Sequence, residues 1–107
     1  MSQPSLVIRR GEVVIDLAHY RVVVGGEPVV PTYREYALLV YLATRAGQAV
    51  SRRRLLEEGL GRHDVGGLRM VDVCIRQLKS KLERHGRVCI EETGDGYRFV
   101  PQEALVG

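Results

Sequence analysis

The sequence predicts a single α+β domain, and three observations carry this prediction. Short β-branched runs separated by glycine turns fill the stretch of about 6–30, which predicts an antiparallel sheet. Apolar residues recur at helical spacing in three segments over about 32–85. Two further β-rich runs flank a glycine-containing turn over about 88–100. The length of 107 residues, treated as one domain over 1–107, suits a single hydrophobic core.

The N-terminal sheet is predicted from apolar runs at 6–8, 12–17, 21–24 and 27–30. The pair Gly25-Gly26 lies between the last two runs, and such a pair is typical of a tight hairpin. Proline lacks the amide hydrogen that a central strand donates, so Pro28 predicts that the last strand is short or lies at a sheet edge.

The first helix begins with a predicted capping box. The Thr32 hydroxyl can accept the Glu35 amide hydrogen while the Glu35 carboxylate accepts the Thr32 amide hydrogen. Apolar residues follow at helical spacing, and Gly47 is a stop signal. Ser51 is the predicted N-cap of a short second helix over about 52–58, with Arg52 and Arg53 in its first turn. Cations there oppose the helix dipole, so they are either solvated or serve a ligand.

A third helix over about 68–84 follows a glycine-rich connection at 59–67. Its apolar face is expected to hold Val71, Cys74, Ile75, Leu78 and Leu82, and the opposite arc to hold Arg69, Val73, Arg76, Gln77 and Ser80. Such a helix can pack on a core and still offer basic, hydrogen-bonding side chains to a polyanion. The alternative is an ordinary solvated helix surface.

Strands, three helices and a β-hairpin, in this order, are typical of a winged helix-turn-helix. In that fold one helix enters the DNA major groove and a hairpin wing lies beside it. The net charge of +3 and pI of about 9.1 permit phosphate contacts without demanding them.

Other classes of protein find little support in the sequence. No apolar run approaches the roughly 20 residues of a membrane helix, and the N-terminus lacks the order of a signal peptide, so a cytoplasmic protein is expected. The cysteines Cys74 and Cys89 form no CxxC pair, and Cys74 fits the core. The sequence leaves open whether the two form a disulfide, although a cytosolic setting argues against one. The histidines and cysteines lack zinc-site spacing, and no nucleophile–base arrangement is evident, so no metal, cofactor or enzyme activity is expected.

Four segments resemble the C-terminal DNA-binding domain of OmpR/PhoB-type response regulators. They lie at 32–39 (helix-one start), 50–56 (helix-two start), 69–82 (recognition helix) and 94–99 (wing), within a resemblance that runs from about residue 12 to residue 100. The resemblance implies a transcriptional regulator that binds duplex DNA as a homodimer on repeated half-sites. It also implies contact with RNA polymerase through the loop 59–67. The family carries an acidic receiver domain upstream, so the chain fits either an effector domain of such a protein or a stand-alone regulator.

Several positions depart from the family pattern. Met70, Cys74, Gln77, Thr93 and Leu60 stand where the family favours Thr, His, Arg, Arg and Trp. Arginine pairs with guanine, whereas glutamine suits adenine. Three acidic residues, Glu91, Glu92 and Asp95, also lie near the wing and would repel phosphates. These departures favour an alternative function, a winged-helix module that docks on polymerase or another regulator and binds DNA weakly.

The candidate DNA-binding residues fall into three groups. The third helix supplies phosphate or base contacts, the wing supplies backbone contacts, and the second helix meets phosphate with its first turn. In chain order these candidates are Arg52, Arg53, Arg69, Val73, Arg76, Gln77, Lys79, Ser80, Thr93, Tyr97 and Arg98.

Overall fold

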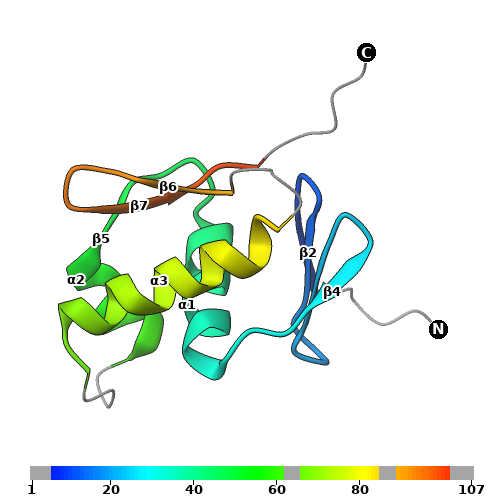
Figure 1. Ribbon diagram of the computed structural model, residues 1–107, viewed down its shortest axis with the longest axis horizontal. Helices are drawn as coiled ribbons and strands as arrows, with labels where there is room; N and C mark the ends of the chain where they lie inside the picture. The colour runs from blue at the N-terminus through cyan, green and yellow to red at the C-terminus, as the bar shows by residue number, and fades with distance from the viewer. Residues whose placement is uncertain (1–5, 62–65, 85–88, 102–107) are drawn as a thin grey trace.

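The computed structural model describes residues 6–61, 66–84 and 89–101. An N-terminal sheet lies at one end, and the helices lie beside it. The hairpin of β6 and β7 runs along one side of the helices, with its turn at the end away from that sheet (Figure 1). The predicted α+β winged helix-turn-helix is confirmed.

The N-terminal sheet contains β1 (Val7–Arg10), β2 (Val13–Asp16), β3 (Arg21–Val24) and β4 (Glu27–Val29). All neighbours are antiparallel and follow chain order. Gly25 and Gly26 have φ of 57° and 84°, the left-handed values that a two-residue hairpin turn requires. As expected from Pro28, β4 is an edge strand.

Helix α1 (Tyr33–Thr44) begins with the predicted capping box. Glu35 N donates to Thr32 Oγ1 at 3.2 Å, and Thr32 N donates to Glu35 Oε1 at 3.0 Å. Glu35 is only 1% exposed, and its carboxylate also accepts from Lys81 Nζ at 2.5 Å. The cap therefore joins the start of α1 to the last turn of α3 (Leu68–Leu82).

The second helix differs from its prediction. A helix over about 52–58 was expected, but the structure has α2 (Arg52–Arg54) followed by a π-helix, η1 (Leu55–Leu60). A Cβ on Gly59 would lie 3.4 Å from Leu38 Cδ2 and 3.6 Å from Tyr41 Cβ, so this turn packs closely on α1. The wider turn is thus a tertiary effect that local helix signals do not encode. The predicted N-cap is confirmed, with Arg54 N donating to Ser51 Oγ at 3.1 Å.

The wing is a three-stranded sheet and not a bare hairpin. Its order is β5 (Val50–Ser51), β7 (Gly96–Phe99), β6 (Ile90–Glu92). The hairpin was predicted from about 88 to 100, and residue 88 lies outside the described residues. Strand β5 was not predicted, since two residues carry no periodicity and their partners lie far along the chain.

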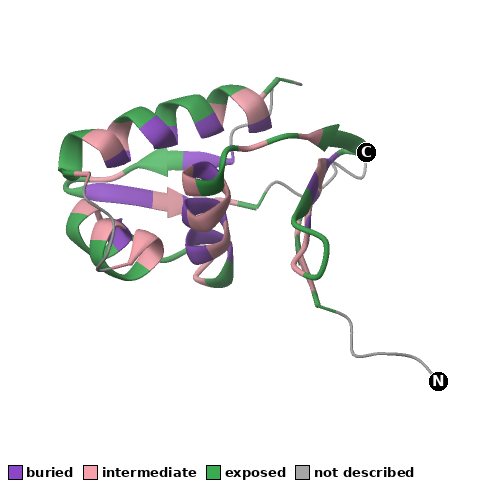
Figure 2. Cartoon of the chain, turned by 90° about the horizontal axis from the view of Figure 1, so that it is seen from below, coloured by how far each residue is buried: buried purple, intermediate pink, exposed green. Residues whose placement is uncertain are grey.

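Helix α3 packs over the core with one face. Val71, Cys74, Ile75, Leu78 and Leu82 are buried, as predicted. Figure 2 shows the buried bands of this helix turned toward the rest of the domain and the exposed bands on its outer side. Both cysteines are buried and unlinked, so the disulfide that the sequence left open does not form. Among the described residues, no helix is long and apolar enough to cross a membrane.

Candidate nucleic-acid interface

The outer face of α3 is basic and largely free of internal contacts. Arg69, Val73, Arg76, Gln77 and Ser80 are exposed on the side opposite the buried stripe. Val73 is 44% exposed, an apolar side chain that the fold leaves in water between cations. Arg69 and Arg76 form no ion pair with any residue of the described ranges. The face therefore offers charge, an amide, a hydroxyl and one apolar side chain to a ligand.

Asp72 connects α3 to both neighbouring elements. Its Oδ1 accepts from Arg52 Nε at 2.6 Å and from Tyr97 Oη at 2.6 Å. Arg52 begins α2, Tyr97 lies in β7, and the guanidinium carbon of Arg52 lies 5.1 Å from the Tyr97 ring centroid. One carboxylate thus sets the position of α2, α3 and the wing relative to one another.

This contact shifts the ionisation of all three groups. The hydrogen bond from Tyr97, followed by the contact with Arg52, holds the pKa of Asp72 below its ordinary value. Burial, and then the bond to Asp72, raises the pKa of Tyr97 to about 12. The bond to Asp72 likewise raises the pKa of Arg52. At neutral pH the network is a carboxylate with two protonated donors.

A second set of contacts attaches α3 to strand β6. Lys79 Nζ donates to the Ile90 carbonyl at 2.8 Å, and Glu83 Oε2 accepts from Cys89 N at 2.9 Å and Ile90 N at 3.3 Å. The Lys79 ammonium is therefore engaged in an internal hydrogen bond, while the neighbouring Ser80 is exposed.

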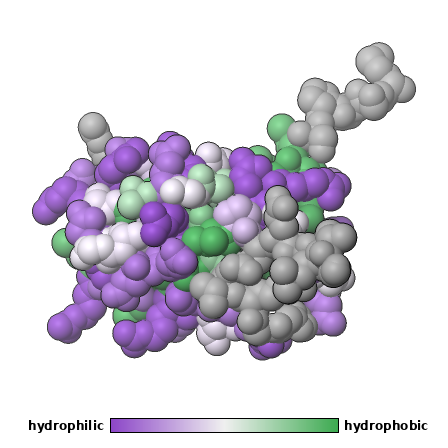
Figure 3. Space-filling model, turned by 90° about the horizontal axis from the view of Figure 1, so that it is seen from above, coloured by the Kyte–Doolittle hydropathy of each residue, from purple (hydrophilic) through white to green (hydrophobic). Residues whose placement is uncertain are grey.

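The acidic residues of the wing lie against cations. Arg98 Nη2 is 3.3 Å from Glu91 Oε2, and Arg52 Nη2 is 3.9 Å from Glu92 Oε2. Hydrophilic side chains cover the left part of the face in Figure 3, over the wing end. Pairing lowers the repulsion that these acids would exert on a phosphate backbone.

The last two candidates differ in how firmly local contacts hold them. Thr93 N donates to the Gly96 carbonyl at 2.8 Å, and its hydroxyl is buried without a partner among the described residues. Thr93 therefore shapes the wing turn and does not project outward. Arg53 is exposed beside α3 and pairs loosely with Glu57 at 3.5 Å.

The structure thus separates the candidates into two sets. An outward set contains Arg53, Arg69, Val73, Arg76, Gln77 and Ser80, while Arg52, Lys79, Thr93, Tyr97 and Arg98 take part in internal contacts. Nothing in the sequence indicated the central role of Asp72. Its partners are 20 and 25 residues away, so no local pattern could have indicated them. Within the described ranges, no group of three or more His, Cys, Asp or Glu side chains could hold a metal ion.

An exposed basic helix face beside a three-stranded wing defines a winged helix-turn-helix domain of the DNA-binding class. The family model of the C-terminal domain of transcriptional regulatory proteins matches residues 26–99. The chain belongs to this family, the OmpR/PhoB-type effector domains, which are DNA-binding transcription-regulator domains and not enzymes.

Individual relatives agree with this assignment. The sensory transduction protein RegX3 of Mycolicibacterium smegmatis is 34% identical over 77 residues, covering 72% of this chain and 34% of that protein. The chain therefore spans about a third of the length of this relative. The Klebsiella pneumoniae RstA DNA-binding domain, solved in complex with the RstA box, is 34% identical with a TM-score of 0.76, covering 90% of this chain and 98% of that chain. The Thermotoga maritima response regulator DrrB, an OmpR/PhoB homologue, is 28% identical with a TM-score of 0.76. The match covers 88% of this chain and 44% of that chain.

Proposed function

We propose that this domain regulates transcription by binding duplex DNA, with α3 in the major groove and the wing beside it. The observation that carries the proposal is the division of α3 into a buried apolar face and an exposed face. That exposed face holds Arg69 and Arg76, which form no ion pair within the described residues. The major groove admits an α-helix, and exposed arginines can meet either phosphates or guanine edges there. Such binding to chromosomal DNA would place the protein in the cytoplasm.

The two sets of candidates take different roles in this proposal. The outward set touches DNA: Arg53, Arg69 and Arg76 supply charge, and Val73, Gln77 and Ser80 lie at base edges. Arg52, Lys79 and Tyr97 position α2, α3 and the wing so that this face has one orientation. Arg98 and the amide of Thr93 maintain the wing.

We further propose two partners. RNA polymerase meets the connection at 59–67, of which residues 62–65 lie outside the described residues. A second copy of the domain occupies a neighbouring half-site, which makes the operator a repeat.

Replacement of Arg76 by alanine is expected to weaken binding to a selected duplex by about tenfold, a loss within the usual range for one base contact. Binding isotherms by fluorescence anisotropy at two salt concentrations measure this. If Arg76 meets a base, affinity falls on the selected sequence and hardly changes on random duplex. If Arg76 meets a phosphate, affinity falls on both the selected and the random duplex. The slope of log affinity against log salt concentration then becomes shallower by about one.

The charge-matched control is Arg21→Ala, which removes an exposed arginine from the remote strand β3. Equal losses for both variants would assign the effect to net charge and contradict the role of α3. Absence of any duplex binding by the wild-type domain at about 50 mM salt would refute the proposal and favour the protein-docking alternative.

Gln77 sets the expected base preference. Glutamine can bond adenine N6 and N7 together, and an apolar side chain suits the thymine methyl group. Gln77 and Val73 are four residues apart on α3, so they lie side by side on the helix surface. Together they indicate that the base pairs they contact are A·T pairs. Selection of bound sequences from random duplexes is expected to return adenine at one position, and Gln77→Arg is expected to change that position to guanine. An unchanged selected sequence would remove Gln77 from the base-contacting set.

A further inference from the structure

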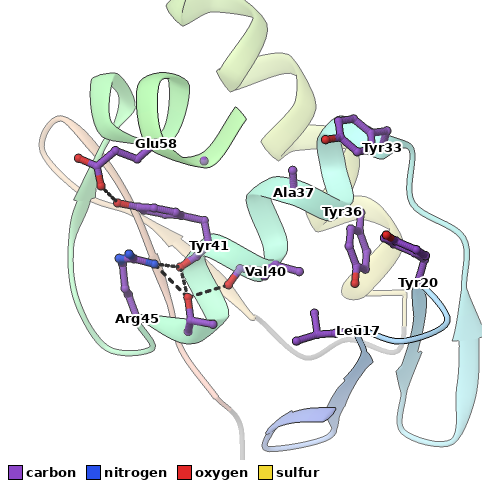
Figure 4. Close-up of a pocket in the computed structure, with 11 residues that line it drawn as sticks. Leu17, Tyr20, Tyr33, Tyr36, Ala37, Val40, Tyr41, Arg45 and Glu58 are labelled. Atoms are coloured by element: carbon purple, nitrogen blue, oxygen red, sulfur yellow. Dashed lines mark hydrogen bonds between the residues drawn. The ribbon is translucent and has the colours of Figure 1, made fainter. Parts of the chain in front are cut away.

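A groove runs along the outer side of α1, and none of the proposed DNA contacts lines it. It lies between the turn after β2, helix α1 and the π-helix η1, and its volume is about 430 Å³. Figure 4 shows tyrosines Tyr20, Tyr33 and Tyr36 toward one end and Tyr41, Arg45 and Glu58 at the other. The DNA-binding role leaves this concentration of tyrosines unexplained.

The tyrosine end is exposed although the residues are aromatic. Tyr33 is 77% exposed and Tyr20 is 70% exposed. Tyr20 also has a φ of 54°, a left-handed conformation unusual for a side chain of this size. Its ring centroid lies 5.6 Å from that of Tyr36, with the rings tilted by 59°, so the two rings pack against each other. Exposed aromatic surface together with backbone strain is typical of a binding site.

Tyr36 contributes an unused hydrogen-bond donor. Its hydroxyl oxygen is buried and finds no partner in the part of the chain that the structure describes. Burial raises the pKa of Tyr36 above its ordinary value. A buried donor without an acceptor is unfavourable, so this hydroxyl lowers the stability of the folded domain.

The other end of the groove has an excess of positive charge. The guanidinium of Arg45 lies 3.7 Å from the Tyr41 ring centroid, and the Tyr41 hydroxyl donates to Glu58. Arg54 Nη2 also donates to the Tyr41 hydroxyl at 3.1 Å. Arg54 Nη2 also lies 3.6 Å from Glu58 Oε1, so these two charges pair, and the charge of Arg45 favours an acidic ligand group at this end.

We propose that this groove binds an extended, proline-containing segment of a partner protein, with an acidic residue at the Arg45 end. Polyproline II segments dock in aromatic-lined grooves, and their carbonyls make no internal hydrogen bonds. An extended segment presents its carbonyls to the groove, whereas a docked helix would keep most of its carbonyls within itself. The proline rings would then pack on Tyr20 and Tyr33, and the acidic residue would pair with Arg45.

The test uses a fluorescein-labelled decapeptide of alternating proline and alanine that ends in two aspartates. Binding to the full chain is expected by fluorescence anisotropy. Tyr33→Ala is expected to weaken it by about fivefold, the value of one lost aromatic contact. Tyr36→Phe removes only the buried hydroxyl, so it is expected to leave peptide binding unchanged while the melting temperature stays equal or rises.

The matched control is Val73→Ala, which removes another exposed apolar side chain, from the DNA face. It is expected to leave peptide binding unchanged and to weaken duplex DNA binding, whereas Tyr33→Ala is expected to do the reverse. Failure of DNA binding and failure of peptide binding are thus separate results.

Three outcomes would overturn the groove proposal. One is no binding at about 1 mM peptide, which is the weak limit of a specific site. Another is equal binding of a peptide with every proline changed to alanine. The third is a dimer in analytical ultracentrifugation that Tyr33→Ala dissociates, because the groove would then hold a second copy of the chain.

Discussion

Replacement of Gly96 by alanine is expected to lower the free energy of unfolding by about 3 kcal/mol, in the upper range for overpacking a closed site. A Cβ at this position would lie 1.8 Å from the Val50 carbonyl oxygen and 2.7 Å from Ser51 Cα. Both are backbone atoms of β5, which pairs with β7 at this point, so neither can move as a flexible side chain can. The substitution therefore forces the strands apart.

Urea denaturation measures this loss, and Gly94→Ala is the matched control. Gly94 lies two residues earlier in the same wing, and a Cβ there would meet nothing within 4 Å. Gly94→Ala is expected to change the free energy of unfolding by less than about 0.5 kcal/mol, as surface substitutions usually do. Equal stabilities of the two variants would show that β5 is not held against β7 as described.

Replacement of Asp72 by alanine is expected to lower the free energy of unfolding by about 2–3 kcal/mol. The change leaves the buried hydroxyl of Tyr97 and the guanidinium of Arg52 without their shared acceptor. It also frees the wing and α2 from α3, so duplex binding is expected to fall by about tenfold or more at temperatures where the variant is folded. Thermal denaturation and anisotropy measure the two effects separately.

Tyr97→Phe is the control, since it removes one of the two donors and keeps the ring. It is expected to have a smaller effect on both stability and DNA binding than Asp72→Ala. If Asp72→Ala lowered stability but left DNA affinity intact, the network would hold the fold without orienting the DNA-binding face.

The same carboxylate predicts a pH dependence of stability. Because the folded state lowers the pKa of Asp72 below its ordinary value of 3.8, ionisation of this group favours folding. Its contribution is fully present above the ordinary pKa and is lost as the pH falls through the lower pKa of the folded state. The wild-type domain is therefore expected to lose stability more steeply below about pH 4 than Asp72→Ala does. Parallel stability curves for the two proteins in acid would contradict this.

Local signals predicted most of the secondary structure. The box of Thr32 and Glu35 set the start of α1, and the Gly25-Gly26 pair set the β3–β4 turn, because each depends on backbone groups a few residues apart. The helical period likewise predicted which side chains of α3 are buried and which are exposed. Local signals did not predict strand β5 or the π-helix η1, because both depend on packing against distant segments.

The sequence by itself determined the fold class and the composition of the exposed face of α3, since both follow from spacing along the chain, and the resemblance of four segments indicated the family. Only the tertiary structure decided how that face is held. It brought Arg52, Asp72 and Tyr97 together. It also paired Arg98 and Arg52 with wing carboxylates that, from the sequence alone, were expected to repel phosphates. It also gathered the tyrosines of α1 and the β2–β3 turn into one groove. The physical reason is the same in each case: these contacts join residues far apart in the chain, and only the closing of the core sets the distances between them.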